Sequence, residues 1–317
     1  MDMQIVFVYC LCDDLLKALQ HYEDPQCQVS DAEILTTALV AALYFGGHFK
    51  RTHEFLHDQR YLPQRLSASR FNRRLHRCAH LLMPLFHGLA QWGHQLNPES
   101  LYIIDSFPVA ACDNIRIPRC RRYQGEAWRG YQASKRRYFY GVKIHLLITA
   151  QGSPVEFFLT PGADSDTKAL KQYAFDVPEK ATVTGDKAYN DYRYEDLLKE
   201  IGLHLIPLRK NNSKRCLDPA VHYLMSTARK AVETTGSLIE RLLPKHIHSV
   251  TAAGFNSKWD SLSLPVALTL FSNRLRWQLG LYTLSVRLLV KSRFTVQPGP
   301  RQVPLMVLFR KAHGKHR

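Results

Sequence analysis

The sequence predicts a mixed α/β protein of the α+β kind, in which a helical N-terminal region precedes a mixed-sheet core. Apolar residues up to about residue 97 recur at helical spacing. From Leu101 onward, short apolar runs bounded by turn residues alternate with further helical stretches. The chain has 317 residues, 45% of them hydrophobic, so it can bury a sizeable core in one large domain or two smaller ones.

The N-terminal region is expected to consist of short helices. Residues 30–33 have the spacing of a capping box ahead of an apolar run, which Gly46 and Gly47 end. A second helix is expected near residues 52–57. A third begins after Ser67, and its predicted DNA-binding stripe consists of Arg70, Arg73, Arg74 and Arg77. Such helices indicate a helix-turn-helix-like DNA-binding unit, and a solvated basic face on a plain helical bundle is the alternative.

The remaining elements follow in a recognisable order. Strands are expected at residues 101–105, 138–148, 155–159, 181–184 and 204–208, and helices from about 166, at 192–200, 219–243 and 262–289. Three strands in a meander, a crossover helix, a fourth strand, a helix, a fifth strand and a long helix form the element order of the ribonuclease H-like fold. In that fold the first and fourth strands are neighbours.

Three acidic residues occupy positions that the hydrophobic pattern does not explain. Asp105 ends the first predicted strand, Asp186 follows the fourth, and Glu233 lies on the long helix. The predicted fold brings these carboxylates together, and two Mg²⁺ ions need such ligands to clamp the oxygens of a phosphodiester displacement. Glu240, two turns further along the helix, is the alternative third acid. Each acid taken alone is more typical of a helix cap or turn.

The charge balance indicates a polyanionic partner, because 43 Lys and Arg against 27 Asp and Glu give a net charge of +16. The apolar runs are too short to span a membrane, and the run at residues 4–12 lacks a basic flank, so we expect a cytoplasmic chain that binds nucleic acid rather than a membrane. The seven cysteines include no CxxC pair, so neither a disulfide framework nor a zinc ribbon is expected.

Residues 116–137 are predicted to form a basic DNA-binding loop. They hold eight Lys or Arg and one acid, with Tyr123, Trp128 and Tyr131 interleaved, so basic groups can follow phosphates while rings stack on exposed bases. A solvated loop packed by its own aromatic residues is the alternative. The expected DNA contacts of this region are Arg116, Arg119, Arg121, Arg122, Lys135, Arg136 and Arg137. Lys143 and Lys187 are expected to contact phosphates near the acids.

Five sequence blocks resemble, in order, those of the DDE transposases of bacterial insertion sequences, and they are most similar to the nine-eighty-two family. The blocks are YIIDSFPV from residue 102, GYQASKRRYFYGVKIH from 130, LTPGA from 159, GDKAY from 185 and RKAVET from 229. The resemblance implies a ribonuclease H-like core whose catalytic and metal-binding triad is Asp105, Asp186 and Glu233. It also matches Arg229 to the arginine of the family signature, which would bind DNA.

The resemblance further implies a transposase that cuts DNA at transposon ends and joins the freed 3′-hydroxyl to target DNA. Two Mg²⁺ ions are expected, with Mn²⁺ able to substitute, and no nucleotide cofactor. The expected partners are terminal inverted repeats and target DNA, bound by a homodimer or higher oligomer in the bacterial cytoplasm, at the nucleoid. The alternatives are an inactive transposase-derived DNA-binding protein and a ribonuclease H-like nuclease that does not join strands.

The expected domains are a helical DNA-binding domain at residues 1–97, a catalytic domain at 98–290 and a flexible basic tail at 291–317. Asn97 and Pro98 mark the first boundary, and the tail contains Lys and Arg but no acid.

Overall fold

The computed structural model describes residues 2–113, 123, 125–132 and 136–242. The expected helix at 262–289 and the expected tail lie outside the described residues. The N-terminal region is helical, as predicted, with α1 (Asp2–Ala18), α2 (Asp31–Tyr44), α3 (Phe49–Asp58), α4 (Ala68–Cys78) and α5 (Leu82–Gln95). The predicted capping box starts α2: the Ser30 hydroxyl accepts a hydrogen bond from the Glu33 N–H, and the Glu33 carboxylate accepts one from the Ser30 N–H.

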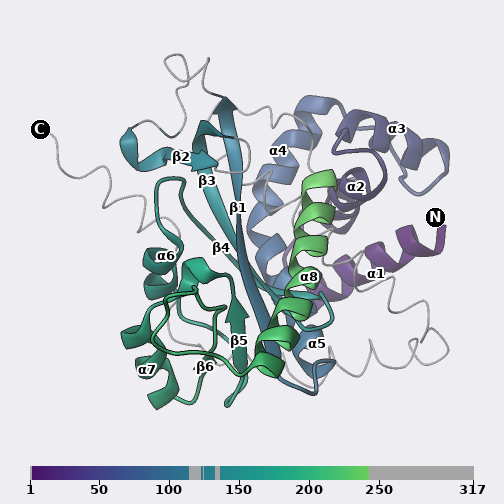
Figure 1. Ribbon diagram of the computed structural model, residues 1–317. Helices are drawn as coiled ribbons and strands as arrows, with labels where there is room; N and C mark the ends of the chain where they lie inside the picture. Colours follow the sequence, from purple (N-terminus) through teal and green to yellow (C-terminus); the bar gives the residue numbers. More distant parts are fainter. Residues whose placement is uncertain (1, 114–122, 124, 133–135, 243–317) are drawn as a thin grey trace, which may run out of the picture.

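One mixed sheet forms the centre of the molecule (Figure 1). Its strands are β1 (Leu101–Asp113), β2 (Arg129–Gln132), β3 (Arg137–Thr149), β4 (Pro154–Pro161), β5 (Thr182–Gly185) and β6 (His204–Leu205). Strands β1, β2 and β4 each pair antiparallel with β3, whereas β5 is parallel to β1 and β6 is parallel to β5. Leaving β2 aside, the order β4-β3-β1-β5-β6 is that of the ribonuclease H-like fold, which confirms the predicted fold class.

Strand β1 is longer than predicted. Its parallel pairing with β5 ends at Ile104 and Gly185, but its antiparallel pairing with β3 continues from Asp105 to Asp113. Asp105 therefore does not end β1. It is the first residue of β1 beyond the part that β5 covers.

Helices cover both faces of the sheet. On one face, α8 (Pro219–Leu242) packs Val232 and Ile239 against residues of β1 and β3, and the Thr235 hydroxyl donates a hydrogen bond of 3.1 Å to the Gly152 carbonyl. Figure 1 shows this long helix running in front of the sheet. On the other face, Leu170 of α6 (Asp166–Gln172) and Leu198 of α7 (Tyr192–Glu200) pack in the same core as residues of α1, α2 and α5. The position of α8 is therefore fixed by the core beneath it.

Helix α2 belongs to two hydrophobic cores. Its residues Leu35 and Leu39 pack with α1, α5 and the sheet, whereas Ile34 and Ala38 pack with α3 and α4. The N-terminal helices and the sheet are thus joined by continuous apolar packing, and the boundaries expected at residues 97 and 290 stay predictions. In the described part of the chain no single helix is long and apolar enough to cross a membrane, and α2 and α3 meet that test only as a pair bent by 110°.

Candidate active site

Two of the predicted acids, Asp105 and Asp186, lie at the same level of neighbouring strands. Ile104 and Gly185 form the last parallel pair of β1 and β5, so Asp105 and Asp186 are the next residues on each strand. A Cβ atom on Gly185 would lie 2.8 Å from Cγ2 of Ile104 and 3.0 Å from Cδ2 of Tyr189. Glycine therefore permits the close packing that sets the two acids side by side.

Each of these carboxylates is held by the backbone beside it. Asp105 accepts a hydrogen bond of 2.8 Å from the Ser106 N–H. Asp186 caps a short 3₁₀ helix (Lys187–Tyr189) and accepts a hydrogen bond of 2.6 Å from the Lys187 N–H. For Asp105, the hydrogen bond from the Ser106 N–H lowers the pKa and so favours the ionised carboxylate.

The third acid reaches the same place from α8. Arg229 lies one turn before Glu233, and its guanidinium is shared by three carboxylates, at 3.2 Å from Oδ1 of Asp186, 3.5 Å from Oε1 of Glu233 and 3.9 Å from Oδ2 of Asp105. The structure therefore brings together all three predicted acids and the predicted arginine. Glu240 is exposed, and in the part of the chain that the structure describes it forms no ion pair with Arg229 or any other base.

The acid cluster contains the type of ligand that Mg²⁺ prefers, but its carboxylates are not arranged as in a metal site. Carboxylate oxygens are the ligands that Mg²⁺ prefers, and here three of them surround one positive charge, which is the Arg229 guanidinium. Among the residues that the structure describes, no three His, Cys, Asp or Glu side chains are arranged to hold a metal ion. The role of Asp105, Asp186 and Glu233 as metal ligands stays a prediction.

Asp105 is the acid whose protonation the fold changes most clearly. The pKa of its carboxyl is raised from 3.8 to about 6, mainly by burial, and the charges of Asp186 and Asp166 contribute to the rise. The Ser106 N–H and the Arg229 guanidinium act in the opposite direction. A positive charge brought to this carboxylate would favour its ionised form.

Asp166 is a fourth acid near the cluster, and it is the first residue of α6 but not its N-cap. The N-cap of α6 is Ser165, which leaves the Asp166 carboxylate to accept hydrogen bonds from the Ser106 hydroxyl at 2.9 Å and the Lys143 ammonium at 3.0 Å. The Ser165 hydroxyl accepts a hydrogen bond from the Lys168 N–H, and a serine directly before a helix is the sequence signal for such an N-cap. Asp166 therefore helps to hold Ser106, the residue after Asp105, in place.

Lys143 was predicted to contact DNA phosphates, and the structure gives it other partners. Its ammonium donates to the Asp164 carbonyl at 2.8 Å as well as to Asp166, and its side chain is only 20% exposed. The Lys143 ammonium is thus paired within the protein with Asp166, which is 23 residues away in sequence but adjacent in the fold.

His145, next to this site, is a buried structural residue. Its ring nitrogens contact the Tyr189 hydroxyl at 2.9 Å and the Thr160 hydroxyl at 3.1 Å. The pKa of His145 is lowered to about 4, mainly by burial; the Asp166 charge opposes this shift and the Lys143 charge adds to it. The imidazole is therefore neutral at physiological pH.

The arginine stripe of α4 is exposed except at Arg74. The Arg74 guanidinium donates to the Val29 carbonyl and forms ion pairs with Glu23 and Asp31, and the side chain is 15% exposed. Arg74 therefore anchors α4 to the loop before α2 instead of facing solvent, which corrects its predicted role. The other described members of the predicted DNA-binding set, apart from Lys143 and the partly buried Arg229, are exposed: Arg70, Arg73, Arg77, Arg136, Arg137 and Lys187.

The predicted basic loop can be followed only in part, since Arg116, Arg119, Arg121, Arg122 and Lys135 lie outside the described residues. Its aromatic residues differ in exposure. Tyr123 is buried against Trp128, with ring centroids 4.7 Å apart, so its ring is part of the core. Tyr131 is 55% exposed and can still meet a base. The segment also contains β2, which sequence reasoning took for loop.

A ribonuclease H-like sheet with acids gathered where β1 and β5 stop pairing defines a domain of the DDE class. Residues 95–248 match the family of the transposase DDE domain, which identifies this part of the chain as similar to that domain. No curated protein matches the chain. A solved structure of piggyBac transposase, in a synaptic complex with hairpin DNA, is similar at 11% identity and a TM-score of 0.42, over 95% of this chain and 86% of that one. A likeness this distant supports no conclusion on function.

Proposed function

We propose that the protein is the DNA transposase of a bacterial insertion sequence. It would cleave phosphodiester bonds at the transposon ends and transfer the freed 3′-hydroxyl groups into target DNA. The observation that supports this most directly is the convergence of Asp105, Asp186 and Glu233 on one guanidinium within a transposase DDE domain.

In this proposal the three carboxylates hold two Mg²⁺ ions, with Mn²⁺ able to substitute. Such ions would stabilise negative charge on the attacking and leaving oxygens of phosphodiester displacement. Arg229 keeps the three acids together against their mutual repulsion, and its positive charge is placed where a DNA phosphate would meet the acids. The Asp105 and Asp186 carboxylates are held in position by the hydrogen bonds that they accept from the backbone N–H groups of Ser106 and Lys187.

The positive charge of the chain supports double-stranded DNA as the partner. The exposed arginines of α4 are suited to contact the phosphates of terminal inverted repeats, and the same protein would then engage target DNA near the acids. Pairing two transposon ends requires two copies or more, so the active complex would be a homodimer or higher oligomer. We place this activity in the bacterial cytoplasm, at the nucleoid.

The experiment that tests the proposal compares two acids of the same helix. Glu233→Gln and Glu240→Gln each remove one carboxylate from α8, but only Glu233 contacts Arg229. Full-length variants would be incubated with Mg²⁺ and DNA taken from the sequence that flanks the reading frame. We expect Glu233→Gln to bind DNA but neither nick nor join it, and Glu240→Gln to behave like the unmutated protein.

Other outcomes separate the alternatives. Loss of cleavage in Glu240→Gln with cleavage retained in Glu233→Gln would refute the triad proposed here. Binding without any Mg²⁺- or Mn²⁺-dependent cleavage by the unmutated protein would identify an inactive, transposase-derived DNA-binding protein. Cleavage without joined products would identify a nuclease that does not transfer strands.

A further inference from the structure

A second charged feature lies at the same edge of the sheet as the acids. It is the segment of residues 209–215, Arg-Lys-Asn-Asn-Ser-Lys-Arg, which we call the basic loop after β6. We propose that this loop is a pre-formed site for DNA phosphates beside the acid cluster, with its arginines holding the loop in shape and its lysines contacting the DNA. The inference rests on the proposed function, because it names how DNA is held near Asp186.

The loop leaves the sheet level with the acids. The Leu208 N–H donates a hydrogen bond of 2.9 Å to the Gly185 carbonyl, so Arg209 and Asp186 are the next residues of adjacent segments. Asn190 connects this point to Lys187: its side-chain amide donates to the Leu208 carbonyl at 2.6 Å and to the Lys187 carbonyl at 2.9 Å. Asp186, Lys187 and the start of the loop thus share one rim of the molecule.

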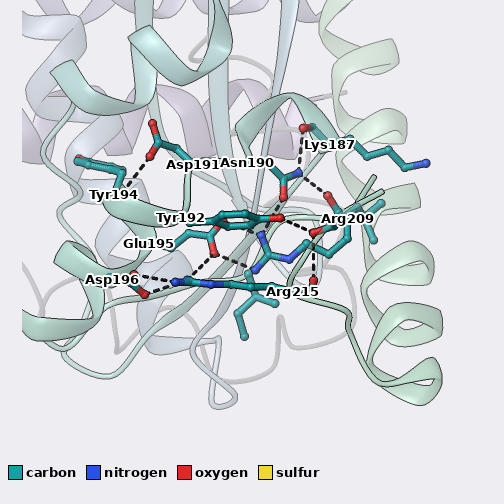
Figure 2. Close-up of polar contacts among 12 residues, drawn as sticks. Lys187, Asn190, Asp191, Tyr192, Tyr194, Glu195, Asp196, Arg209 and Arg215 are labelled. Carbon is teal, nitrogen blue, oxygen red and sulfur yellow. Dashed lines mark hydrogen bonds and ion pairs between the residues drawn. The ribbon is translucent and has the colours of Figure 1, made fainter. Parts of the chain in front are cut away.

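Arg209 fixes the beginning of the loop to α7. Its guanidinium forms two parallel hydrogen bonds with the Glu195 carboxylate, at 2.7 and 2.8 Å, and a third with the Asn190 side chain at 2.8 Å (Figure 2). The Arg209 and Glu195 side chains are 10% and 5% exposed. This buried pair of opposite charges leaves Arg209 no free charge for DNA.

Arg215 fixes the end of the loop in a similar way. It makes two hydrogen bonds with the Asp196 carboxylate, at 2.8 and 2.7 Å, next to the first pair on α7 (Figure 2). Both guanidinium groups also lie against the Tyr192 ring, with Arg209 Cζ at 5.5 Å and Arg215 Cζ at 4.8 Å from its centroid. The two ends of the loop are therefore held by one helix.

The Tyr192 hydroxyl orders the middle of the loop. It accepts a hydrogen bond from the Lys214 N–H at 3.2 Å and lies 2.5 Å from the Ser213 hydroxyl, which in turn donates to the Arg215 carbonyl at 3.2 Å. A turn closes where the Ser213 N–H donates to the Lys210 carbonyl at 3.0 Å. Such a loop loses little conformational freedom when it binds.

The charges that remain are lysines. Two acids of α7 neutralise the two arginines, whereas Lys210 and Lys214 are exposed, and neither ammonium has an ion-pair partner within the described ranges. Lys187, on the same rim, is exposed too, and its side chain extends away from the contacts drawn in Figure 2. Lysines and the exposed amides of Asn211 and Asn212, without a carboxylate in the loop, suit a phosphate backbone.

Binding of the full-length protein to DNA, measured in EDTA so that no cleavage occurs, tests this proposal. The probe is fluorescein-labelled double-stranded DNA of mixed sequence, and anisotropy is recorded from 0.05 to 0.3 M salt. The double variant Lys210→Gln/Lys214→Gln should bind roughly tenfold more weakly for each lysine replaced at 0.1 M salt, with a salt slope smaller by about 1.8. Lys199→Gln, an exposed lysine at the far end of α7, is the matched control and should leave both values unchanged.

A second variant tests the pre-formed shape. Tyr192→Phe removes the hydroxyl contacts of the loop without changing any charge, and it should weaken DNA binding several-fold while the far-ultraviolet circular dichroism stays the same. Equal affinities and slopes for the unmutated protein and the double variant would overturn the proposal while leaving the transposase assignment intact. Failure of the unmutated protein to bind DNA would instead overturn the proposed function.

Discussion

Replacing Asp105 with Asn should stabilise the metal-free protein at neutral pH. In the folded chain the Asp105 carboxyl is largely buried beside Asp166 and Asp186, and its ionised form is disfavoured. Asparagine has nearly the same shape as the protonated acid but carries no charge to bury. A residue proposed as a metal ligand would thus reduce stability when the metal is absent.

The size and the sign of the effect follow from the pKa. The pKa of Asp105 is about 6 in the folded protein against an ordinary 3.8, and each unit corresponds to about 1.4 kcal/mol, so its ionisation costs the folded state about 3 kcal/mol. Between pH 4 and 6 the folded state binds more protons at this site than the unfolded state does. Its stability therefore falls as pH rises through that window, and the full cost is present above about pH 6.

Urea unfolding of the unmutated protein and Asp105→Asn, in EDTA at pH 4 and pH 8, measures this cost. The variant should be more stable by about 3 kcal/mol at pH 8 and by little at pH 4. Glu240→Gln removes an exposed acid of α8 and serves as the control for a change in net charge. Equal stability of Asp105→Asn and the unmutated protein at both pH values would refute the reasoning.

Two further predictions concern charges in and beside the fold's core. Arg229→Gln should destabilise the metal-free protein by about 1–2 kcal/mol, because three partly exposed carboxylates lose the cation that they share, and Arg229→Lys should restore only part of the loss; unchanged urea midpoints would count against this role. Glu156→Gln should raise the unfolding free energy by about 3 kcal/mol at pH 9 and by little at pH 4, because burial raises the pKa of this acid from 4.5 to about 7; a gain of equal size at both pH values would contradict that cause.

The elements of the fold that could be predicted are those that appear as local runs in the sequence. Strands β3 and β4 and helices α7 and α8 lie within a few residues of their expected bounds because each has a continuous apolar pattern or a helical repeat. Strand β2 was missed because Arg129–Gln132 contains no such run, and it becomes a strand only through its pairing with β3.

The candidate site was predictable where one residue stood out against its surroundings. Asp105 and Asp186 directly follow apolar runs of the sequence, so their positions could be inferred without knowing their neighbours. The roles of Arg74 and Lys143 could not, because the acids that bind them are distant in sequence: Asp31 is 43 residues from Arg74, and Asp166 is 23 residues from Lys143. A basic stripe does not reveal which of its members the fold will use internally.

Because α2 packs in both hydrophobic cores, it fixes the distance between α4 and the acid cluster. Phe71 and Leu75 of α4 pack in the same core as Ile34 of α2, and the next residue of α2, Leu35, packs in the core that contains Ile104 of β1. The connection between α4 and the acid cluster therefore consists of hydrophobic packing rather than a flexible linker. If α4 binds DNA as proposed, this packing would set the distance in base pairs between the DNA bound by α4 and the bond cut beside Asp105.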